Sequence, residues 1–577
     1  MTATQVIVLA TPVFFLLIAL EYLVSVSRRK PVYQLGDAIN SVSLGVLSQL
    51  SVVFTPLLAL GLYTAAYNRL ALWPNEAFWS SWYGVLLALL MYDFCYYWLH
   101  RGGHEVAVLW AAHVVHHQSQ HYNLSTALRQ TSSGALLAWL FYLPMALAGV
   151  PPLIFGIVAL IDLLYQFWVH TELVGKLGWF DRVFVSPSNH RVHHAVNDPY
   201  LDKNYGGILI LWDRLFGSFH EEKEPCVYGT RSALRSWDPL WANTEVYWGL
   251  LLDSWRARNW GDKLRVWFKP PGWRAPDVAQ AWPKPAFDLA QVRRYGPALS
   301  AGTRWFACVQ FVLLIVGVAT VLWFAGSWPQ SSTAIFSAML LACYWALGGV
   351  LQGRLSMLAS LLIESAALAT ASSALGMTEW HYLFKPLTML LALVLVVQQF
   401  RARTLATRPA WLLGAALCAS LAGDVFLMLP GNWFIPGLAS FLVAHLFYIG
   451  LFRMGQAWFP SRLGLAAPLG VGALMLIWVW SGLPDPALKV AVSAYVLVIG
   501  LMAAQAIGRA TQLRGSAAVM VAVGACVFVL SDSLIAVNRF VSPVPLAPLW
   551  ILASYYAAQV LIVLQAGDGR GGAAGFR

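Results

Sequence analysis

Apolar residues run along this chain in long blocks that short polar segments separate. Each block has about 20 residues, the length that an α-helix needs to cross a hydrocarbon core of about 30 Å. The pattern predicts an all-α, polytopic integral membrane protein. The clearest blocks cover residues 6–26, 43–62, 82–99, 305–325, 411–429, 434–451 and 546–564.

Between these blocks lie a shorter apolar hairpin and one long polar segment. The hairpin covers residues 134–170 and is interrupted by the sequence GVPP, and the polar segment covers 171–303. Basic residues follow the first block, as SRRK, and recur in the polar segment, as KLRVWFKPPGWR. Because basic loops stay on the cytoplasmic side, we expect the N-terminus outside and the polar segment, with the histidines, inside. We also expect the bacterial inner membrane as the location.

The composition agrees with a membrane protein and limits its partners. Of 577 residues, 59% are hydrophobic and 11% are charged, and this length is sufficient for two domains. The net charge of +11 is scattered through interhelical loops, so we expect no nucleic-acid partner. The six cysteines stand singly, which favours packing roles over disulfides or a sulfur-ligated metal. The first block lacks a small-residue cleavage site, and we expect it to remain as an anchor.

Histidines divide the chain into two parts. Eleven of the 13 histidines lie between His100 and His220, and after residue 305 the chain is almost continuously apolar, with only His381 and His445. We therefore predict a histidine-rich, di-metal helical domain over 1–377 and a multi-span helical bundle over 378–577.

Nine of the histidines form spaced motifs that indicate metal binding. Residues three and four apart share one face of a helix, so HRGGH, HVVHH and HRVHH each present several imidazoles together. A single buried histidine is usually an ordinary core residue, but imidazole is too costly to bury in such numbers without a function. Nine imidazoles exceed the four ligands of a zinc site and predict two ions, although imidazole suits zinc, copper, nickel and iron alike. The nine are His100, His104, His113, His116, His117, His170, His190, His193 and His194.

The motifs and their flanks resemble the fatty acid hydroxylase and sterol desaturase superfamily of membrane di-iron enzymes. The segments DFCYYWLHRGGHEVAVLWAAHVVHH, YNLSTALRQ, LLYQFWVHTELV and HRVHHAVNDPYLDKNYGGILILWDRLFGSF are similar to the alkylglycerol monooxygenase branch, which cleaves ether lipids. The resemblance implies that the nine histidines hold two iron ions. It further implies that tetrahydrobiopterin donates electrons and that Glu105 is a functional acid.

The sequence departs from the family pattern at two places, and one further histidine lies outside the pattern. Gly102 and Gly103 are expected to loosen the turn that joins His100 to His104. Asn189 stands where the resemblance implies a further histidine, and His121 matches no ligand position.

The second part places single polar residues inside apolar runs. An intramembrane carboxylate is a functional-site hypothesis by default, although an aspartate paired with Lys385 or Arg539 could simply fix helix packing. Residues 381–565 resemble the lysoplasmalogenase (alkenylglycerophospholipid hydrolase) family. The resemblance implies that Asp424 and Asp532 are catalytic acids and that four other residues line the site: Lys385, His445, Tyr448 and Gln559.

Together these observations favour a bifunctional enzyme that degrades ether lipids. The first domain would use O2 to cleave alkylglycerols, and the second would hydrolyse the vinyl ethers of lysoplasmalogens, so alkyl- and alkenylglycerols, lysophospholipids and the membrane are the expected partners. The alternative is a fatty acid, sterol or carotenoid hydroxylase or desaturase with a non-catalytic, lipid-handling second domain.

Overall fold

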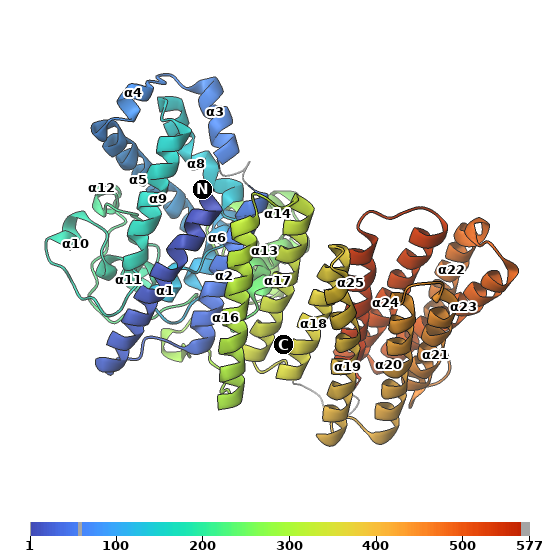
Figure 1. Cartoon of the computed structure of the whole chain (residues 1–577). Coiled ribbons are helices and arrows are strands. Elements are labelled where there is room, and N and C mark those ends of the chain that lie inside the picture. The colour runs from blue at the N-terminus through green and yellow to red at the C-terminus, as the bar shows by residue number, and fades with distance from the viewer. Residues whose placement is uncertain (1, 56–59, 567–577) are drawn as a thin grey trace. The chain divides into compact units, whose positions relative to one another are not determined.

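The computed structural model describes residues 2–55 and 60–566, and there the predicted all-helical fold is confirmed (Figure 1). Twelve helices within these ranges are long and apolar enough to cross a membrane, which is consistent with a multi-pass membrane protein. The chain separates into two compact units, Met1–Trp328 and Pro329–Arg577. The boundary predicted after residue 377 would fall inside the second unit, between α18 (Met357–Ala374) and α19 (Thr378–Arg401). Helix α17 (Gln330–Leu351) packs against α18, and α18 packs against α19, so both α17 and α18 belong to the second unit.

The first unit carries many short elements between its long helices. Helix α5 (Trp82–Glu105) packs against the two shorter apolar helices α8 (Ala135–Ala148) and α9 (Pro152–Trp168). The helices besides these three are α1 (Ala3–Ser27), α2 (Leu35–Phe54), α3 (Leu62–Leu70), α4 (Glu76–Trp79), α6 (Ala107–His113), α7 (Leu124–Ala127), α10 (Phe180–Val183), α11 (Pro187–His194), α12 (Leu211–Phe216), α13 (Pro239–Arg256), α14 (Trp260–Phe268), α15 (Pro276–Ala281) and α16 (Ala301–Phe324). Three-residue or four-residue 3-10 turns are η2 (Val114–His117), η3 (Asp198–Tyr200) and η4 (Leu289–Gln291).

The second helix does not occupy the predicted block 43–62. Helix α2 begins at Leu35, because the side chain of Gln34 accepts a hydrogen bond from the backbone of Asp37 at 2.6 Å and caps the helix. It ends at Phe54, and residues 56–59 lie outside the described part of the chain. The predicted block began too late in the sequence, because Asp37 and Asn40 lower the mean hydropathy of the first half of the helix. Both residues are buried and face protein rather than lipid.

The two glycines of HRGGH do not loosen a turn, contrary to the prediction. Helix α5 is continuous through Gly102 and Gly103 to Glu105. A Cβ on Gly103 would lie 3.5 Å from the ring of His113, and one on Gly102 would lie 3.3 Å from Leu109 and Phe141. Gly102 therefore lets α6 and α8 approach the last turn of α5 closely, whereas a side chain at position 103 would make an ordinary van der Waals contact with His113.

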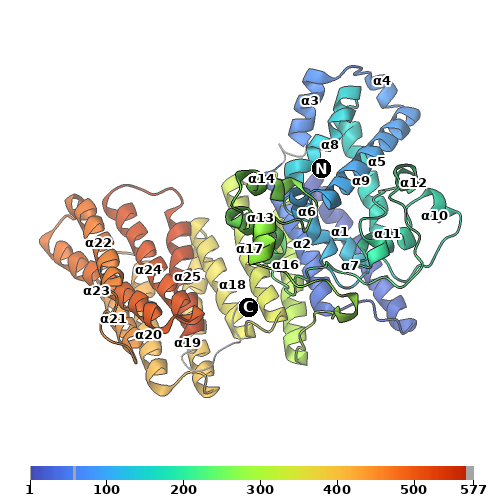
Figure 2. The same ribbon diagram turned by 180° about the vertical axis from the view of Figure 1, so that it is seen from behind.

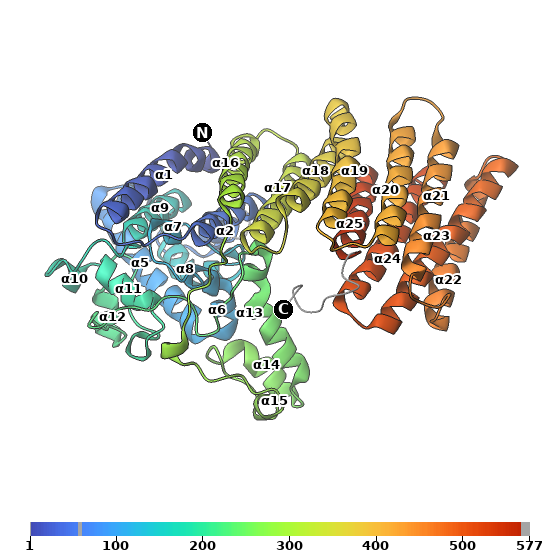
Figure 3. The same cartoon turned by 90° about the horizontal axis from the view of Figure 1, so that it is seen from below.

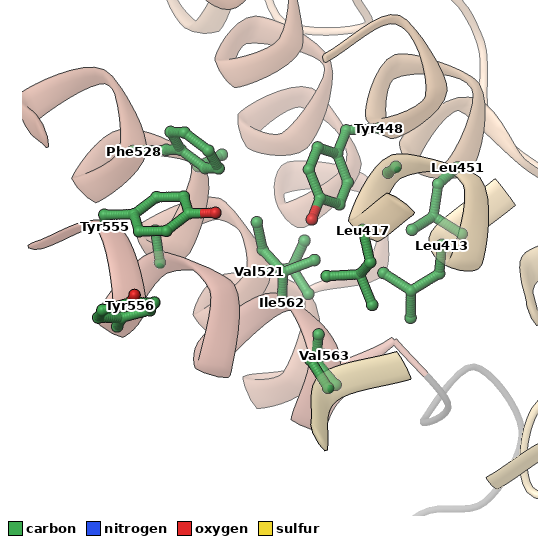
Figure 4. Packing of buried hydrophobic residues seen from close by; sticks show 14 of the residues in the cluster. Leu413, Leu417, Tyr448, Leu451, Val521, Phe528, Tyr555, Tyr556, Ile562 and Val563 are labelled. Atoms are coloured by element: carbon green, nitrogen blue, oxygen red, sulfur yellow. The ribbon is translucent and has the colours of Figure 1, made fainter. Parts of the chain in front are cut away.

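The second unit is a bundle of long helices. Their packed core is formed by buried aliphatic and aromatic residues, among them Leu413, Leu417, Val521 and Ile562 (Figure 4). The helices are α17 (Gln330–Leu351), α18 (Met357–Ala374), α19 (Thr378–Arg401), α20 (Thr407–Met428), α21 (Phe434–Arg453), α22 (Arg462–Val479), α23 (Pro486–Leu513), α24 (Ser516–Phe540) and α25 (Ala547–Gln565), with the 3-10 turn η5 (Trp480–Gly482).

Candidate metal centre and intramembrane polar site

The nine histidines gather in the first unit as two separate groups. The first group holds five imidazoles and the second holds four, and within each group the atoms that could bind a metal lie within 4.8 Å of one another. The first group is His100, His104, His113, His117 and His193, and the second is His116, His170, His190 and His194.

Each sequence motif contributes to the groups through its local helix geometry. His100 and His104 occupy the last turns of α5, one turn apart, and therefore face the same group. The motif HVVHH is split, because it ends in the tight turn η2, where His116 and His117 point to different groups. The motif HRVHH lies on α11, where His190 and His194 belong to the second group and His193 belongs to the first.

Backbone carbonyls orient several of these rings. The Nδ1 atom of His100 donates to the carbonyl of Tyr205 at 2.8 Å, and that of His116 donates to the carbonyl of Arg129 at 2.9 Å. The Nδ1 atom of His170 donates to the carbonyl of Gln166 at 2.8 Å. Since a carbonyl can only accept, the proton sits on Nδ1 and Nε2 keeps its lone pair, which is the arrangement typical of metal-binding histidines.

The Nε2 atoms of these rings face one another. His113 Nε2 lies 3.1 Å from His100 Nε2 and 3.0 Å from His117 Nε2, and in the second group His170 Nε2 lies 3.1 Å from both His116 Nε2 and His190 Nε2. Within the described ranges, the buried Nε2 atoms of His104 and His193 have no hydrogen-bond partner. Converging lone pairs repel unless a cation lies among them, so this donor set fits two metal ions.

Three imidazoles from the two groups illustrate the protonation state that a metal requires. Burial, reinforced by neighbouring imidazoles, holds the pKa of His193 and His194 well below the usual value, and burial lowers the pKa of His116 to about 4. Near neutral pH these three rings are therefore uncharged and able to donate their lone pairs.

Buried charged residues hold the segments that carry the ligands, and the sequence analysis did not single them out. Asp213 accepts from the backbone of Tyr205 at 2.7 Å and of Gly206 at 2.8 Å, which fixes the carbonyl that orients His100. The fully buried Arg129 donates from Nε to the carbonyl of Val115 at 2.6 Å and from Nη1 to Asn40 at 2.9 Å. Asp213 and Arg129 both lie inside the sequence segments on which the family resemblance rests. A charged residue beside apolar neighbours was the signal in the sequence that could have indicated them.

Three other residues lie apart from the two groups. Glu105 has a side chain that is 47% exposed and pairs with Arg101 at 2.9 Å, and its catalytic role remains a prediction. The side-chain amide of Asn189 donates to the carbonyls of Asp181 and Phe184. His121 is buried but belongs to neither group.

In the second unit, Asp424 is the centre of a buried polar network. Its carboxylate lies 3.5 Å from Lys385 Nζ and accepts a hydrogen bond from the hydroxyl of Tyr555 at 2.6 Å. Gln559 links Tyr555 to Tyr448, because its amide nitrogen lies 3.4 Å from one hydroxyl and its oxygen accepts from the other. Figure 4 shows the hydroxyls of Tyr448 and Tyr555 pointing into the same space.

Asp532 belongs to a second polar set beside an apolar pocket. The hydroxyl of Tyr495 donates to Asp532, and His445 Nε2 lies 2.9 Å from the same hydroxyl. Tyr495 and Asp532 line the pocket, whose other walls are mostly apolar side chains such as Leu438 and Phe441. Sequence reasoning missed Tyr495 and Tyr555, because a tyrosine inside an apolar run looks the same as a core tyrosine.

This helical chain has the histidine site of a membrane hydroxylase, because residues 85–218, which carry all nine histidines, match the family described as fatty acid hydroxylase. The chain is 40% identical over 267 residues to human alkylglycerol monooxygenase, covering 46% of this chain and 59% of that protein. It is 38% identical over 321 residues to the zebrafish (Danio rerio) alkylglycerol monooxygenase, covering 53% of this chain and 68% of that protein. Through its first unit, the chain belongs to the alkylglycerol monooxygenase family.

The second unit matches a different family. Residues 380–566 match the YhhN family, and the chain is 36% identical over 161 residues to mouse lysoplasmalogenase TMEM86B, covering 27% of this chain and 63% of that protein. No solved structure matches the chain. The predicted resemblances to these two families are therefore both confirmed.

Proposed function

We propose that this protein degrades ether lipids through two separate activities, oxidative cleavage of alkylglycerols in the first unit and hydrolysis of alkenyl ethers in the second. The observation that carries the first activity is the pair of histidine groups in a chain of the alkylglycerol monooxygenase family. The second activity is supported by the polar sets around Asp424 and Asp532 within the segment that resembles lysoplasmalogenase.

The nine histidines would hold two iron ions, five residues around one and four around the other. With tetrahydrobiopterin as electron donor, the metal pair would supply the activation of O2 that places one oxygen atom on the carbon next to the ether oxygen. The product is a hemiacetal, which separates into a fatty aldehyde and a glycerol derivative. Neutral imidazoles, oriented by the carbonyls of Tyr205, Arg129 and Gln166, keep the ligand set in place.

In the second unit, the carboxyl of Asp532 would protonate the vinyl ether carbon that is not bonded to oxygen. Tyr495 donates a hydrogen bond to this carboxyl group and stabilises the anion that proton transfer leaves behind. Water then adds to the cation and returns a proton to the carboxylate, and the hemiacetal releases an aldehyde. Asp424, held by Lys385 and Tyr555, is the second catalytic acid, and Gln559 and Tyr448 extend its network.

The shared product class connects the two activities. Both reactions convert an ether-linked chain into a fatty aldehyde, one from saturated and the other from unsaturated ethers. We further propose that the histidine groups face the cytoplasm of a bacterium, which the basic residues of the segment 171–303 support.

The decisive experiment combines metal analysis with two assays on the purified chain. We expect about two irons per chain, since the two ligand groups each fit one ion, together with O2-dependent release of aldehyde from an alkylglycerol and aldehyde release from a lysoplasmalogen without O2. A single zinc per chain with no oxidation would contradict the first activity. Failure to hydrolyse lysoplasmalogens would contradict the second.

A further inference from the structure

Helices α13 and α14 of the first unit lie outside the segments that match the fatty acid hydroxylase and YhhN families, and α14 exposes an apolar stripe. Trp260, Leu264 and Phe268 are spaced four residues apart and therefore share one face of the helix. Their exposed fractions are 80%, 66% and 67%, whereas Val266, between them in sequence, is buried.

Helix α13 continues the exposed apolar surface. Trp241, Trp248 and Trp255 are spaced seven residues apart, which places them on one stripe of the helix. Their exposure increases along the helix and reaches 81% at Trp255, five residues before Trp260. Helices α13 and α14, called the α13–α14 hairpin below, thus both display large aromatic side chains.

The opposite side of the hairpin is firmly packed. Arg274 donates from Nε and Nη2 to the two oxygens of Asp253 at 2.7 and 2.8 Å, and each side chain is only 9% exposed. Ala257 and Val278 form a small core beneath it. Figures 2 and 3 show α13 and α14 at the edge of the first unit. The exposed stripes are therefore a defined surface of a folded element.

The hairpin also carries a strong excess of positive charge. Residues 255–275 contain six basic side chains and one acidic side chain, Asp262. Arg258, Arg265 and Lys269 are exposed, whereas Lys263 turns inward and donates to the carbonyls of Ser254 and Trp255. A protruding surface of aromatic residues with basic residues among them is typical of an element that lies in a membrane interface.

We propose that the α13–α14 face lies in the headgroup layer of the bilayer, with its aromatic side chains among the acyl chains and its basic residues on anionic lipid phosphates. The bilayer is available to this face because α1, α2 and α16 of the same unit are candidate membrane spans. The surplus of positive charge complements anionic headgroups. This inference goes beyond the proposed reactions and does not depend on them.

The position of the hairpin gives this contact a consequence for the histidine groups. The backbone of Ala107 donates to the carbonyl of Lys269 at 3.0 Å, so the end of α14 is joined to the start of α6, which ends at His113. Gln118, just after η2, donates to the carbonyl of Ala242 on α13. The element in contact with lipid thus packs directly against the ligand-bearing segment, where an amphiphile leaving the headgroup layer would first meet the protein.

Photocrosslinking tests the proposal on the full-length protein. Leu264 is replaced by benzoylphenylalanine, the protein is placed in nanodiscs of phosphatidylcholine with a minor share of phosphatidylglycerol, and the adducts are identified by mass spectrometry. Lys223→benzoylphenylalanine is the matched control, because this exposed residue of the same unit lies among acidic side chains. We expect lipid adducts at position 264 and none at position 223.

A second measurement tests the role of charge. Among the adducts at position 264, the anionic lipid should exceed its share of the bilayer by about twofold or more, and the double variant Arg258→Gln/Arg265→Gln should remove this enrichment. The substituted residues Leu264, Arg258 and Arg265 are all exposed. Unchanged elution and unchanged metal content of each variant check that it folds. Adducts to a second copy of the chain, no lipid adduct at position 264, or equal lipid shares would each overturn the proposal.

Discussion

At the scale of single residues, the split of the motifs HVVHH and HRVHH between two groups makes the metal content informative. His193 belongs to the group of five and His116 to the group of four. We expect His193→Ala and His116→Ala each to lower the iron content from about two to about one per chain and to abolish alkylglycerol oxidation, because each removes a ligand from a different ion. Mass spectrometry of the metals and the alkylglycerol assay provide the measurement.

His220→Ala is the control for this pair, since His220 lies outside both groups. It should keep both irons and most of the oxidation. Loss of all metal in either single variant would mean that the two groups do not bind independently, and unchanged iron in both would remove these histidines from the ligand set.

At the scale of elements, Arg129 joins α2 to the tight turn η2. It is fully buried, and its guanidinium donates to Val115, Asn40 and, from Nη2, to Gln118 at 3.2 Å. We expect Arg129→Met to lower the free energy of unfolding by about 3 kcal/mol, because the buried acceptors lose their donor. Thermal unfolding of the purified protein in detergent measures this effect.

The matched control is Lys176→Met, which removes an ion pair with Glu221 in which both side chains are about half exposed. Exposed pairs of this kind contribute about 0–1 kcal/mol, so the unfolding temperature should hardly move. Equal effects of the two substitutions would show that Arg129 does not hold the two elements together.

At the scale of the whole molecule, we expect the two activities to be separable by mutation. Asp424→Asn should abolish hydrolysis of lysoplasmalogen and leave alkylglycerol oxidation nearly intact, since asparagine keeps the size of aspartate and can still accept from Tyr555 but cannot serve as the second catalytic acid beside Asp532. His193→Ala should do the reverse. If Asp424→Asn leaves hydrolysis unchanged, the carboxylate is better explained as a helix-packing partner of Lys385.

The sidedness of the chain is a further property of the whole molecule. We expect a cysteine at Lys223 to be labelled from the cytoplasmic side and one at Thr2 from the outside, following the basic loops. Both residues are exposed, whereas Gln118 beside the histidines is buried and would not be labelled from either side. Labelling of Lys223 from the outside would place the histidine groups on the opposite face.

The sequence by itself determined the class of fold and the location of the chemistry. Hydropathy depends on local composition, so blocks of apolar residues were sufficient to predict a helical membrane protein. The histidine motifs could be recognised because their spacing is also a local property, since residues three and four apart share one face of a single helix. The family resemblances rested on continuous segments around the motifs and did not need the fold.

Only the tertiary structure decided how these residues are partitioned. The division of nine histidines into five and four depends on turns such as η2, whose direction no spacing rule provides. The polar first half of α2 is favourable because Ser119 and Trp237, distant in sequence, bond to Asp37 and Asn40. The glycines of α5 are likewise explained by a distant neighbour, since Phe141 packs closely against Gly102. The roles of Arg129, Tyr495 and Tyr555 also arise from contacts with other helices, because a hydrogen bond between distant segments leaves no periodic trace in the sequence.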